Sequence, residues 1–526
     1  MLILIALCSC RGRSGGDAGN WEGRSLGSAP VYPLSDGSVE FTWWYPIDSR
    51  VLQYMKSYAE NPAFQEIQKK TGIKIKFIHP PVSNTEENFN LMIASGDLPD
   101  LIQTANRYPG GEIKAWEDGV YHELTPWMEK CAPDYYRLIH SREDVEKQAY
   151  KTGKKLLAFY KLCFDPLIPF LRPILRADWL EEFGMDAPRT FDDFEKYFQA
   201  IQAKKHGVTP FFIDFSAAGQ QNIFMSPFNM NPSWYQIDNK IQAYFDAPEY
   251  KNFLERMQNW FVKGYLSKDV ASMKLAQAFA LFDSGKLGGY SESVDATFSR
   301  LWGNKNIRMT TTPDPRLYPG QKLHFGDPGY PIGGIPDANA VTTACKNTEL
   351  AVKFLNFGYT PEGSMIYNYG AEGLTWTMVD GEPRFTDYYL NNPQGMSGGV
   401  LSYALRIHFG PKLLRSDMVI SKAGTSDAMQ LAIYNNRMRW SDDPDIDSAY
   451  RLLPGIELTT AERDEYNAIM ANVNAYVSEM KLKFIMNAES LDNYDAYIRR
   501  LYQLGYPRAK EIYQAAYDRV REQYQD

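Results

Sequence analysis

Residues 39–104 alternate between two kinds of hydrophobic pattern, and this alternation limits the fold more than any other feature of the chain. "VEFTWWYP" is a run of β-branched and aromatic residues closed by Pro46, which is typical of a buried strand. An amphipathic stretch follows at 55–70, and "IKIKFIHP" then alternates like a second strand. "TEENFNLMIASGD" has helical spacing with Thr85 as its cap, and "LPDLIQT" returns to a short strand. This order of elements predicts a parallel α/β sheet.

The remainder of the chain is rich in helical patterns and contains no stretch that resembles a linker. Helices are predicted in "RADWLEEFGM", in "TFDDFEKYFQAIQAKK" with Thr190 as its cap, and in "PEYKNFLERMQNWFVKGYL". "NTELAVKFLNFGYTPEGSMIYNYG" indicates two helices divided at Thr360, and 459–525 is helical with interruptions near Asn487 and Gly505. The 526 residues exceed a usual single domain, so we expect two lobes built from interleaved segments.

The charge balance excludes one class of partner. The net charge of -8 lacks the basic surplus of a nucleic-acid-binding protein, so no nucleic acid is expected. It also argues against a strongly anionic ligand attracted by the charge of the whole protein, and it slightly favours a neutral one. Aromatic residues make up 14% of the chain. Most of these rings are expected in the core, but a surplus of Tyr and Trp also suits surfaces that face sugars.

The N-terminus carries a short apolar run followed by two cysteines. No stretch reaches the roughly 18 to 20 apolar residues of a transmembrane helix. The tetrapeptide "LCSC", which ends at Cys10, resembles the lipobox of bacterial lipoprotein signal peptides, whose cysteine receives diacylglycerol. Bulky Leu7 occupies the position before Cys8, where a lipobox has a small residue, so Cys10 is the expected lipidation site. Because no Lys or Arg precedes the run, the sequence leaves open whether Met1 is the true start.

These features divide the chain into three parts. Residues 1–10 are expected to be a lipoprotein signal peptide, and 11–37, rich in Gly and Ser, a flexible tether. The ordered body is expected to span 38–526. A diacylglycerol group supplies two acyl chains, which suffice for stable anchoring.

Residues with the spacing of a catalytic or metal site do not appear. Cys131, Cys163 and Cys345 are far apart, and the six histidines are scattered. The acidic run "SDDPDIDS" at 441–448 lacks the glycine and final glutamate of a calcium loop, and a solvated loop is expected there. No nucleophile elbow or phosphate-binding loop occurs. We therefore expect no catalytic residue, metal or cofactor.

Four segments in the same order carry a resemblance to a known family. The first is "LMIASGDLPDLI" at 91–102, which resembles the hallmark of family 1 extracellular solute-binding proteins, the sugar-capturing subunits of ABC importers. "LRADWLEEFGMDAPRTFDDFEKYFQAIQAKK" resembles the family's R-x-D-W-L helix and the helix after it. The segments at 344–387 and 490–519 resemble the C-lobe and C-terminal helices of its large lipoprotein-type members. Together the matches cover nearly the whole chain after residue 38.

The resemblance implies a fold and a function. The fold is a helix-rich α/β, two-lobed periplasmic-binding-protein-like fold of type II, with a hinge between the lobes. The function is a monomeric, lipid-anchored receptor on the extracellular or periplasmic side of the cell membrane, which delivers an oligosaccharide to an ABC permease. Large relatives often carry a calcium loop after the "FEKYFQAIQAK" helix. Here that place reads "KKHGVTPFF", without a carboxylate cluster, so no calcium site is carried over.

Ligand-binding residues are expected where strands end, because ligands of open α/β sheets lie beyond the carboxyl ends of the strands. Sugars offer flat C–H faces to aromatic rings and hydroxyls to Asp, Arg, Asn or Gln. The candidates near the first and third strands are Trp44, Tyr45, Asp48, Ser95, Asp97 and Gln103, and candidates near other turns are Arg176, Trp234, Trp302 and Trp376. An equally good interpretation of Arg176 is a salt bridge with Asp178.

Two other functions remain open on the sequence alone. A secreted polysaccharide-acting enzyme would use a pair of carboxylates, and sequence cannot give their separation in space. A receptor for a peptide or another solute is the second alternative. Neither the sugar nor its length follows from any residue.

Overall fold

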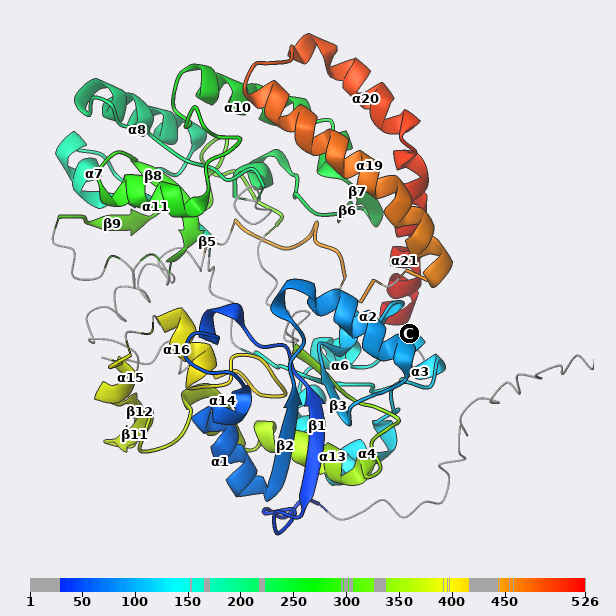
Figure 1. Ribbon diagram of the computed structural model, residues 1–526. Helices are drawn as coiled ribbons and strands as arrows, with labels where there is room; N and C mark the ends of the chain where they lie inside the picture. The colour runs from blue at the N-terminus through cyan, green and yellow to red at the C-terminus, as the bar shows by residue number, and fades with distance from the viewer. Residues whose placement is uncertain are drawn as a thin grey trace, which may run out of the picture. The chain divides into compact units, whose positions relative to one another are not determined.

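The computed structural model describes residues 29–151, 154–164, 171–216, 223–294, 297, 301, 306–325, 337–390, 392–394, 396, 398–415, 443, 445–453, 455–456 and 458–525. The chain divides into two compact units, each made of three segments (Figure 1). Unit 1 comprises Met1–Leu162, Ile332–Ala371 and Ser402–Leu414, and unit 2 comprises Cys163–Pro331, Glu372–Leu401 and Arg415–Asp526. The two units are therefore interleaved in sequence.

Unit 1 contains a five-stranded sheet with one reversed strand. Its strands are β1 (Val39–Trp44), β2 (Ile73–Ile78), β3 (Leu101–Gln103), β4 (Phe159–Tyr160) and β10 (Ala338–Val341), in the order β2-β1-β3-β10-β4. β1 is parallel to β2 and β3, whereas β10 is antiparallel to β3 and β4. The carboxyl ends of β1 to β4 and the start of β10 consequently meet at one edge, which we call the carboxyl edge.

Local sequence explains the first helix of unit 1. The Asn61 side chain accepts hydrogen bonds from the backbone of Ala63 and Phe64, and Pro62 occupies the first helical position. The helix α1 (Pro62–Thr71) ends at Gly72, whose φ of 70° favours glycine. This helix starts later than the amphipathic pattern at 55–70 predicted, because the cap and the proline set its beginning.

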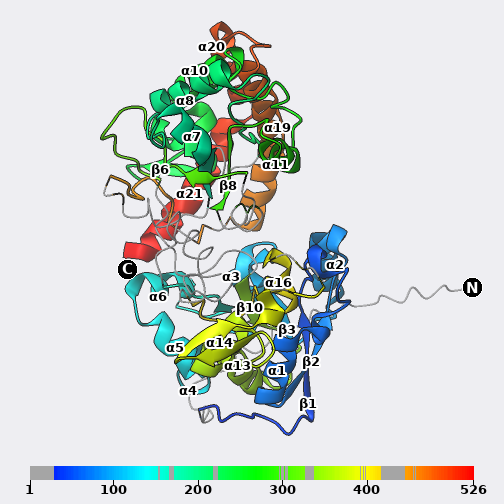
Figure 2. The same cartoon turned by 90° about the vertical axis from the view of Figure 1, so that its left-hand side faces the viewer.

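The other helices of unit 1 cover the sheet. They are α2 (Thr85–Ser95), α3 (Gly111–Glu117), α4 (Thr125–Cys131), α5 (Pro133–Ile139), α6 (Glu143–Ala149), α13 (Thr348–Asn356) and α14 (Pro361–Tyr369). α14 lies beside α1 (Figure 2). Trp43, fully buried in β1, packs its ring against Phe64, Phe77 and Phe354. Aromatic packing therefore joins the sheet to α1 and α13.

The predicted strand, helix, strand order is confirmed for β1, α1, β2, α2 and β3. The role of Thr85 is corrected. A short 3-10 turn at Val82–Asn84 runs directly into α2, so Thr85 is already its first helical residue, and the capping position falls to Asn84, which makes no side-chain cap bond. The predicted break at Thr360 is confirmed, since its side chain caps α14.

Unit 2 combines small antiparallel sheets with long helices. Its strands are β5 (Leu171–Arg176), β6 (Tyr235–Ile237), β7 (Lys240–Gln242), β8 (Gly289–Ser293), β9 (Met309–Thr311), β11 (Trp376–Val379) and β12 (Glu382–Phe385). β5 lies between β8 and β9 and is antiparallel to both, while β6 with β7 and β11 with β12 form hairpins. The fold class is therefore α/β, as predicted, but the sheets are mixed or antiparallel where the sequence predicted a parallel one.

The helices of unit 2 are α7 (Ala177–Phe183), α8 (Phe191–Lys204), α10 (Tyr250–Val262), α11 (Leu275–Asp283), α15 (Asp387–Leu390), α16 (Gly398–Ala404, ending in unit 1), α19 (Thr460–Ile485), α20 (Tyr494–Gln503) and α21 (Tyr506–Gln525). Of these, α7, α8, α10 and α19 to α21 match the predicted helical segments, whereas α11, α15 and α16 were not predicted. The Thr190 side chain caps α8, as predicted. Asn487 and Gly505, both with positive φ, lie at the two predicted interruptions of the C-terminal helices.

The end of the expected tether is packed against unit 1. The Tyr32 hydroxyl donates a hydrogen bond of 2.9 Å to the Lys353 carbonyl, and the Leu34 amide donates one of 2.7 Å to the Thr71 carbonyl. The tether predicted over 11–37 is thus corrected for its last residues, and Cys10 and the signal peptide lie outside the described residues. Within the described part of the chain, no helix is both long and apolar enough to cross a membrane.

Candidate functional site

Four segments of unit 1 converge at the carboxyl edge. They are the loop after β1, the residue after β4, the residue before β10 and the stretch 402–414. The Tyr45 hydroxyl donates a 2.6 Å hydrogen bond to the Phe409 carbonyl, and the Asn61 amide donates one of 2.8 Å to the Tyr403 carbonyl. These bonds fix 402–414 against the loop after β1. We call the group the edge cluster, and its residues are Asp48, Arg50, Lys161, Asp337, Tyr403, His408, Phe409 and Lys412.

The loop after β1 is held by its own hydrogen bonds. The His79 Nδ1 atom lies 2.6 Å from the Tyr45 carbonyl, and the Tyr58 hydroxyl accepts a 3.2 Å hydrogen bond from the Asp48 amide. Burial lowers the pKa of His79, although its bond to Tyr45 opposes that shift. The neutral His79 ring therefore holds the loop after β1 in place, and with it Asp48 and Arg50.

A buried ion pair lies at the centre of the edge cluster. The Lys161 Nζ atom is 2.6 Å from Asp337 Oδ2, and the Lys412 Nζ atom donates a 2.6 Å hydrogen bond to the Ile407 carbonyl. Burial raises the pKa of Asp337, against the attraction of Lys161 and Lys412. Burial also lowers the pKa of Lys412, and repulsion from Lys161 and Arg406 adds to that effect. Two lysines thus lie near one buried carboxylate.

A layer of rings and one guanidinium covers the outside of this pair. Arg50 makes two 2.8 Å hydrogen bonds to Asp48, through Nε and Nη2, and its guanidinium lies 4.6 Å from the centre of the Tyr403 ring. The hydrogen bonds from Arg50 hold the pKa of Asp48 below its usual value. The His408 ring stacks on Tyr403 with centroids 4.3 Å apart and contacts Phe409. His408 and Arg50 are exposed, so this layer faces solvent in unit 1.

His408 is held in its neutral form. Its pKa is lowered by burial and by repulsion from Lys412, Lys161, Arg406 and Arg50. A neutral imidazole offers one donor, one acceptor and a ring face to a ligand.

Several buried polar atoms at the carboxyl edge have no hydrogen-bond partner among the described residues. They include Gln103 Nε2, Thr104 Oγ1, Asn339 Oδ1 and Asp337 Oδ1. Asn339 lies opposite Gln103 in the β3–β10 register, and Thr104 follows with a φ of 71°. A buried polar group without a partner costs about 1 to 3 kcal/mol, and such costs persist mainly at functional sites. The edge therefore holds polar groups that a hydroxyl-rich ligand could engage.

Four predicted site residues of unit 1 lie at or beside the carboxyl edge. Tyr45 and Asp48 belong to the loop beside the edge cluster, and Gln103 ends β3. Trp44 ends β1, where its buried ring contacts Phe89 of α2.

Ser95 and Asp97 lie in the turn before β3. The Ser95 hydroxyl donates to the Met92 carbonyl and accepts from the Asp97 amide, so both residues stabilise the turn, and both are exposed.

The predicted residues of unit 2 lie in separate elements. Arg176 ends β5 and binds Asp178 through two hydrogen bonds, which is the salt bridge that the sequence left as an alternative. Trp234 donates a 2.7 Å hydrogen bond to the Tyr466 hydroxyl and stacks on Tyr513, so it packs against the C-terminal helices. Trp376 is buried in β11. Trp302 lies outside the described residues, and none of these contacts identifies a ligand site.

Most of the edge cluster escaped the sequence-based prediction. Lys161, Asp337 and Tyr403 come from segments far apart in the chain. One local signal was available in "RIHFGPK" at 406–412, where three basic side chains flank an aromatic residue in a Gly-Pro loop. Basic and aromatic residues in a loop favour binding over packing.

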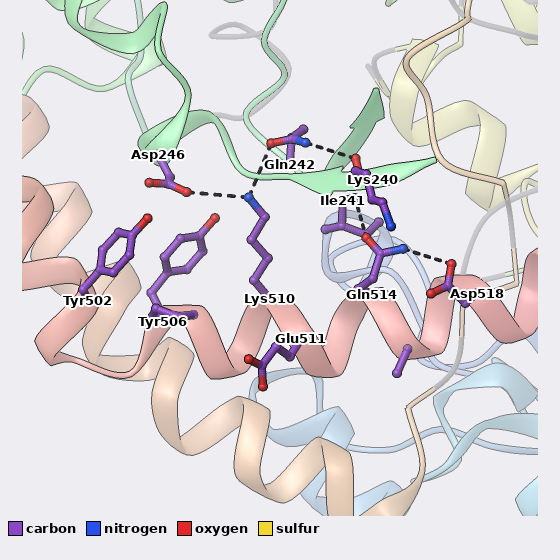
Figure 3. A pocket seen from close by; sticks show the side chains of 12 residues that line it. Lys240, Ile241, Gln242, Asp246, Tyr502, Tyr506, Lys510, Glu511, Gln514 and Asp518 are labelled. Carbon is purple, nitrogen blue, oxygen red and sulfur yellow. Dashed lines mark hydrogen bonds and ion pairs between the residues drawn. The ribbon is translucent and has the colours of Figure 1, made fainter. Parts of the chain in front are cut away.

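An open pocket of about 500 Å³ lies in unit 2 between the β6–β7 hairpin and α21 (Figure 3). The Lys510 Nζ atom lies 3.6 Å from Asp246 and donates a 3.4 Å hydrogen bond to Gln242. Tyr502 and Tyr506 point their hydroxyls toward Asp246 (Figure 3). Burial raises the pKa of Asp246, against the attraction of Lys510. We call this set the helix pocket.

Within the described residues, no group of three or more His, Cys, Asp or Glu side chains could hold a metal ion. The acidic run at 441–448 is instead partly tied down by ion pairs. Asp443 binds Arg316 at 2.7 Å, and Asp447 binds Lys322 and His324 at 2.9 Å each. In its described part this loop is therefore bound to unit 2 and is not simply solvated.

Comparison with known proteins gives consistent results. A family model for bacterial extracellular solute-binding proteins matches residues 52–365. Lipoprotein LipO of Bacillus subtilis is 26% identical over 350 residues, which cover 63% of this chain and 67% of LipO. The polygalacturonan/rhamnogalacturonan-binding protein YtcQ of B. subtilis is 23% identical over 307 residues, which cover 56% of this chain and only 57% of YtcQ.

Solved structures show the same fold. A crystal structure of an extracellular solute-binding protein from Bifidobacterium longum subsp. infantis matches with a TM-score of 0.74 at 14% identity, covering 92% of this chain and 98% of that one. At this identity the likeness concerns the fold alone.

Proposed function

Because the chain belongs to the family of bacterial extracellular solute-binding proteins, we propose that it is a cell-surface receptor that captures an oligosaccharide and delivers it to an ABC permease. YtcQ is named as a polysaccharide-binding protein, and the family model covers residues 52–365, more than half of the chain. The receptor releases its ligand unchanged, so no catalytic residue is assigned.

The observation that carries this proposal is the composition of the edge cluster. The exposed His408 ring stacks on Tyr403, and the guanidinium of Arg50 lies over the ring of the same tyrosine. Sugar rings pack their C–H faces on aromatic rings, and their hydroxyls take hydrogen bonds from charged groups. The edge also lies where ligands of open α/β sheets bind. A micromolar affinity corresponds to about -8 kcal/mol, which a few such contacts can supply.

The anchor is part of the same proposal. Cys10 is proposed to carry the diacylglycerol that holds the receptor on the outer face of the cell membrane as a monomer. Metabolic labelling with palmitate tests this, with Cys8→Ser as the matched control for Cys10→Ser. Label that survives in the Cys10→Ser protein would show that Cys10 is not the anchor.

Thermal melting with a panel of oligosaccharides tests the receptor function. A ligand present at about 100 times its dissociation constant adds about 2.7 kcal/mol to the free energy of unfolding, so the binding sugar raises Tm. Chromatography of the same mixtures should show the sugar unchanged. Release of shorter sugars would support the enzyme instead, and a flat Tm across the panel would contradict the receptor.

A further inference from the structure

Positive charge gathers at the edge cluster although the whole chain is negative. The cluster contains the basic groups Arg50, Lys161 and Lys412, and Arg406 lies near enough to repel Lys412 and His408, against the carboxylates of Asp48 and Asp337. The complete chain has a net charge of -8. The positive surplus is therefore a local property of this surface, and it selects among ligands at short range rather than by the charge of the whole protein.

Two of these cations are within reach of a ligand. The Arg50 side chain is 51% exposed, and Asp48 occupies only its Nε and Nη2 edge. The Lys161 side chain is 19% exposed beside Asp337. Lys412 is buried near the Lys161–Asp337 pair, and its burial keeps it from direct contact with a ligand. An incoming anion would thus meet two partly exposed cations, Arg50 and Lys161.

The rings of the cluster lie beside these cations. His408 is exposed and stacks on Tyr403, the ring over which Arg50 lies. Phe409 lies next to His408, and the Lys161 Nζ atom is 5.9 Å from the Phe409 ring centre. Each of the two rings that contact His408 therefore lies close to a cation, Tyr403 to Arg50 and Phe409 to Lys161.

From this geometry we propose that the edge cluster binds an oligosaccharide containing uronic acid residues, with a sugar ring on His408 and its carboxylate on Arg50 or Lys161. The inference rests on the proposed receptor function. A planar carboxylate suits a guanidinium fork, whereas a neutral sugar leaves the positive surplus without a partner. This ligand class replaces the neutral one that the net charge of the chain favoured. Polygalacturonan, which the name of YtcQ specifies, has the same chemistry.

Matched pairs of sugars test the charge separately from the sugar backbone. The full chain is titrated calorimetrically with tetrasaccharides of galacturonate, of mannuronate and of glucuronate, and with the carboxyl-reduced form of each. At least one acidic tetrasaccharide should bind, and its reduced form should bind more weakly by about tenfold or more, since hydrogen bonds to charged groups are the stronger ones. The preference should shrink at high salt.

The outcomes separate the two proposals. A reduced or other neutral sugar that binds as well as the acidic ones overturns the uronate inference and leaves the receptor intact. If no oligosaccharide of either kind binds, the receptor function and the inference fall together.

A pair of variants places the effect at the edge cluster. Arg50→Gln should weaken the uronate by about tenfold and leave its reduced form within about twofold. Arg142→Gln is the matched control, because Arg142 also forms a double hydrogen bond with an aspartate two residues away, Asp144, on the start of α6. Arg142→Gln should change neither affinity. Equal losses for both variants, or losses for both sugars with Arg50→Gln, would contradict the inference.

Discussion

The edge cluster of unit 1 and the helix pocket of unit 2 are built from similar groups but differ in what those groups do. Each contains a carboxylate whose pKa is raised by burial, at least one lysine and at least one tyrosine. In the helix pocket Lys510 divides its bonds between Asp246 and Gln242, and Gln514 binds Ile241 and Asp518. These polar groups bind one another, as expected where a hairpin packs on a helix, although the buried Tyr506 hydroxyl has no hydrogen-bond partner among the described residues.

The polar groups of the edge cluster do not satisfy one another in this way. Two lysines share one carboxylate, and Asp337 Oδ1 has no hydrogen-bond partner among the described residues. Apart from Tyr403 in α16 and Arg50 in a 3-10 turn, its residues come from loops and strand ends, whereas those of the helix pocket come from a hairpin, a 3-10 turn and two helices. The difference agrees with the proposal that the side chains of the helix pocket serve packing and those of the edge cluster serve binding.

The largest expected difference between the two places is in stability. Asp337→Asn leaves Lys161 and buried Lys412 without their carboxylate, and removing one partner of a buried ion pair costs about 3 to 5 kcal/mol. Asp246→Asn should cost below about 1 kcal/mol, because Lys510 is partly exposed and 3.6 Å away. Urea unfolding of the two variants measures both. Similar losses of unfolding free energy in the two variants would show that the carboxylates of the two sites are equally important to their ion pairs.

A double variant identifies the cause of the larger loss. If Asp337→Asn destabilises by leaving a buried charge, adding Lys412→Met should recover a large part of the stability, because the charge itself is removed. A loss that persists unchanged in the double variant would come from shape and not from charge.

The second difference is in ligand binding. His408→Ala removes an exposed ring from the edge cluster and should weaken sugar binding by about tenfold, since an aromatic contact contributes about 1 kcal/mol. Tyr502→Ala removes a ring that is 52% exposed in the helix pocket and should leave affinity unchanged. Calorimetry with the tightest sugar compares them. A larger effect from Tyr502→Ala would move the binding site to unit 2.

Much of the fold could be predicted because its signals are local. The run that forms β1 and the cap and proline at Thr360 act within a few residues, so short stretches of sequence contain them. Thr85 was misplaced because a 3-10 turn precedes α2, and hydrophobic spacing does not distinguish such a turn from the first turn of the helix.

The candidate site could be predicted only in part. Tyr45 and Asp48 follow a strand directly, so the rule of strand ends found them. Lys161 and Asp337 belong to the same edge only because β10 returns between β3 and β4, and this strand order has no local signature. The Tyr466 partner of Trp234 was hidden for the same reason, since that contact depends on the tertiary fold. The Asp178 partner of Arg176 lies only two residues away, and the sequence offered it as an alternative.

The smallest expected difference is in the response to pH, and its sign is opposite at the two places. Hydrogen bonds from Arg50 lower the pKa of Asp48 from 3.8, so the folded carboxylate contributes stability above that pH and loses it as the pH falls. Burial raises the pKa of Asp246 from 3.8, so its contribution is present below that pH and is lost as the pH rises. The cost of Asp48→Asn should therefore shrink toward acid, and that of Asp246→Asn toward neutral pH. Urea midpoints of both variants and the unaltered protein, measured across this range, give the two slopes. If the cost of Asp48→Asn instead shrinks toward neutral pH, as expected for Asp246→Asn, burial and not Arg50 determines the pKa of Asp48.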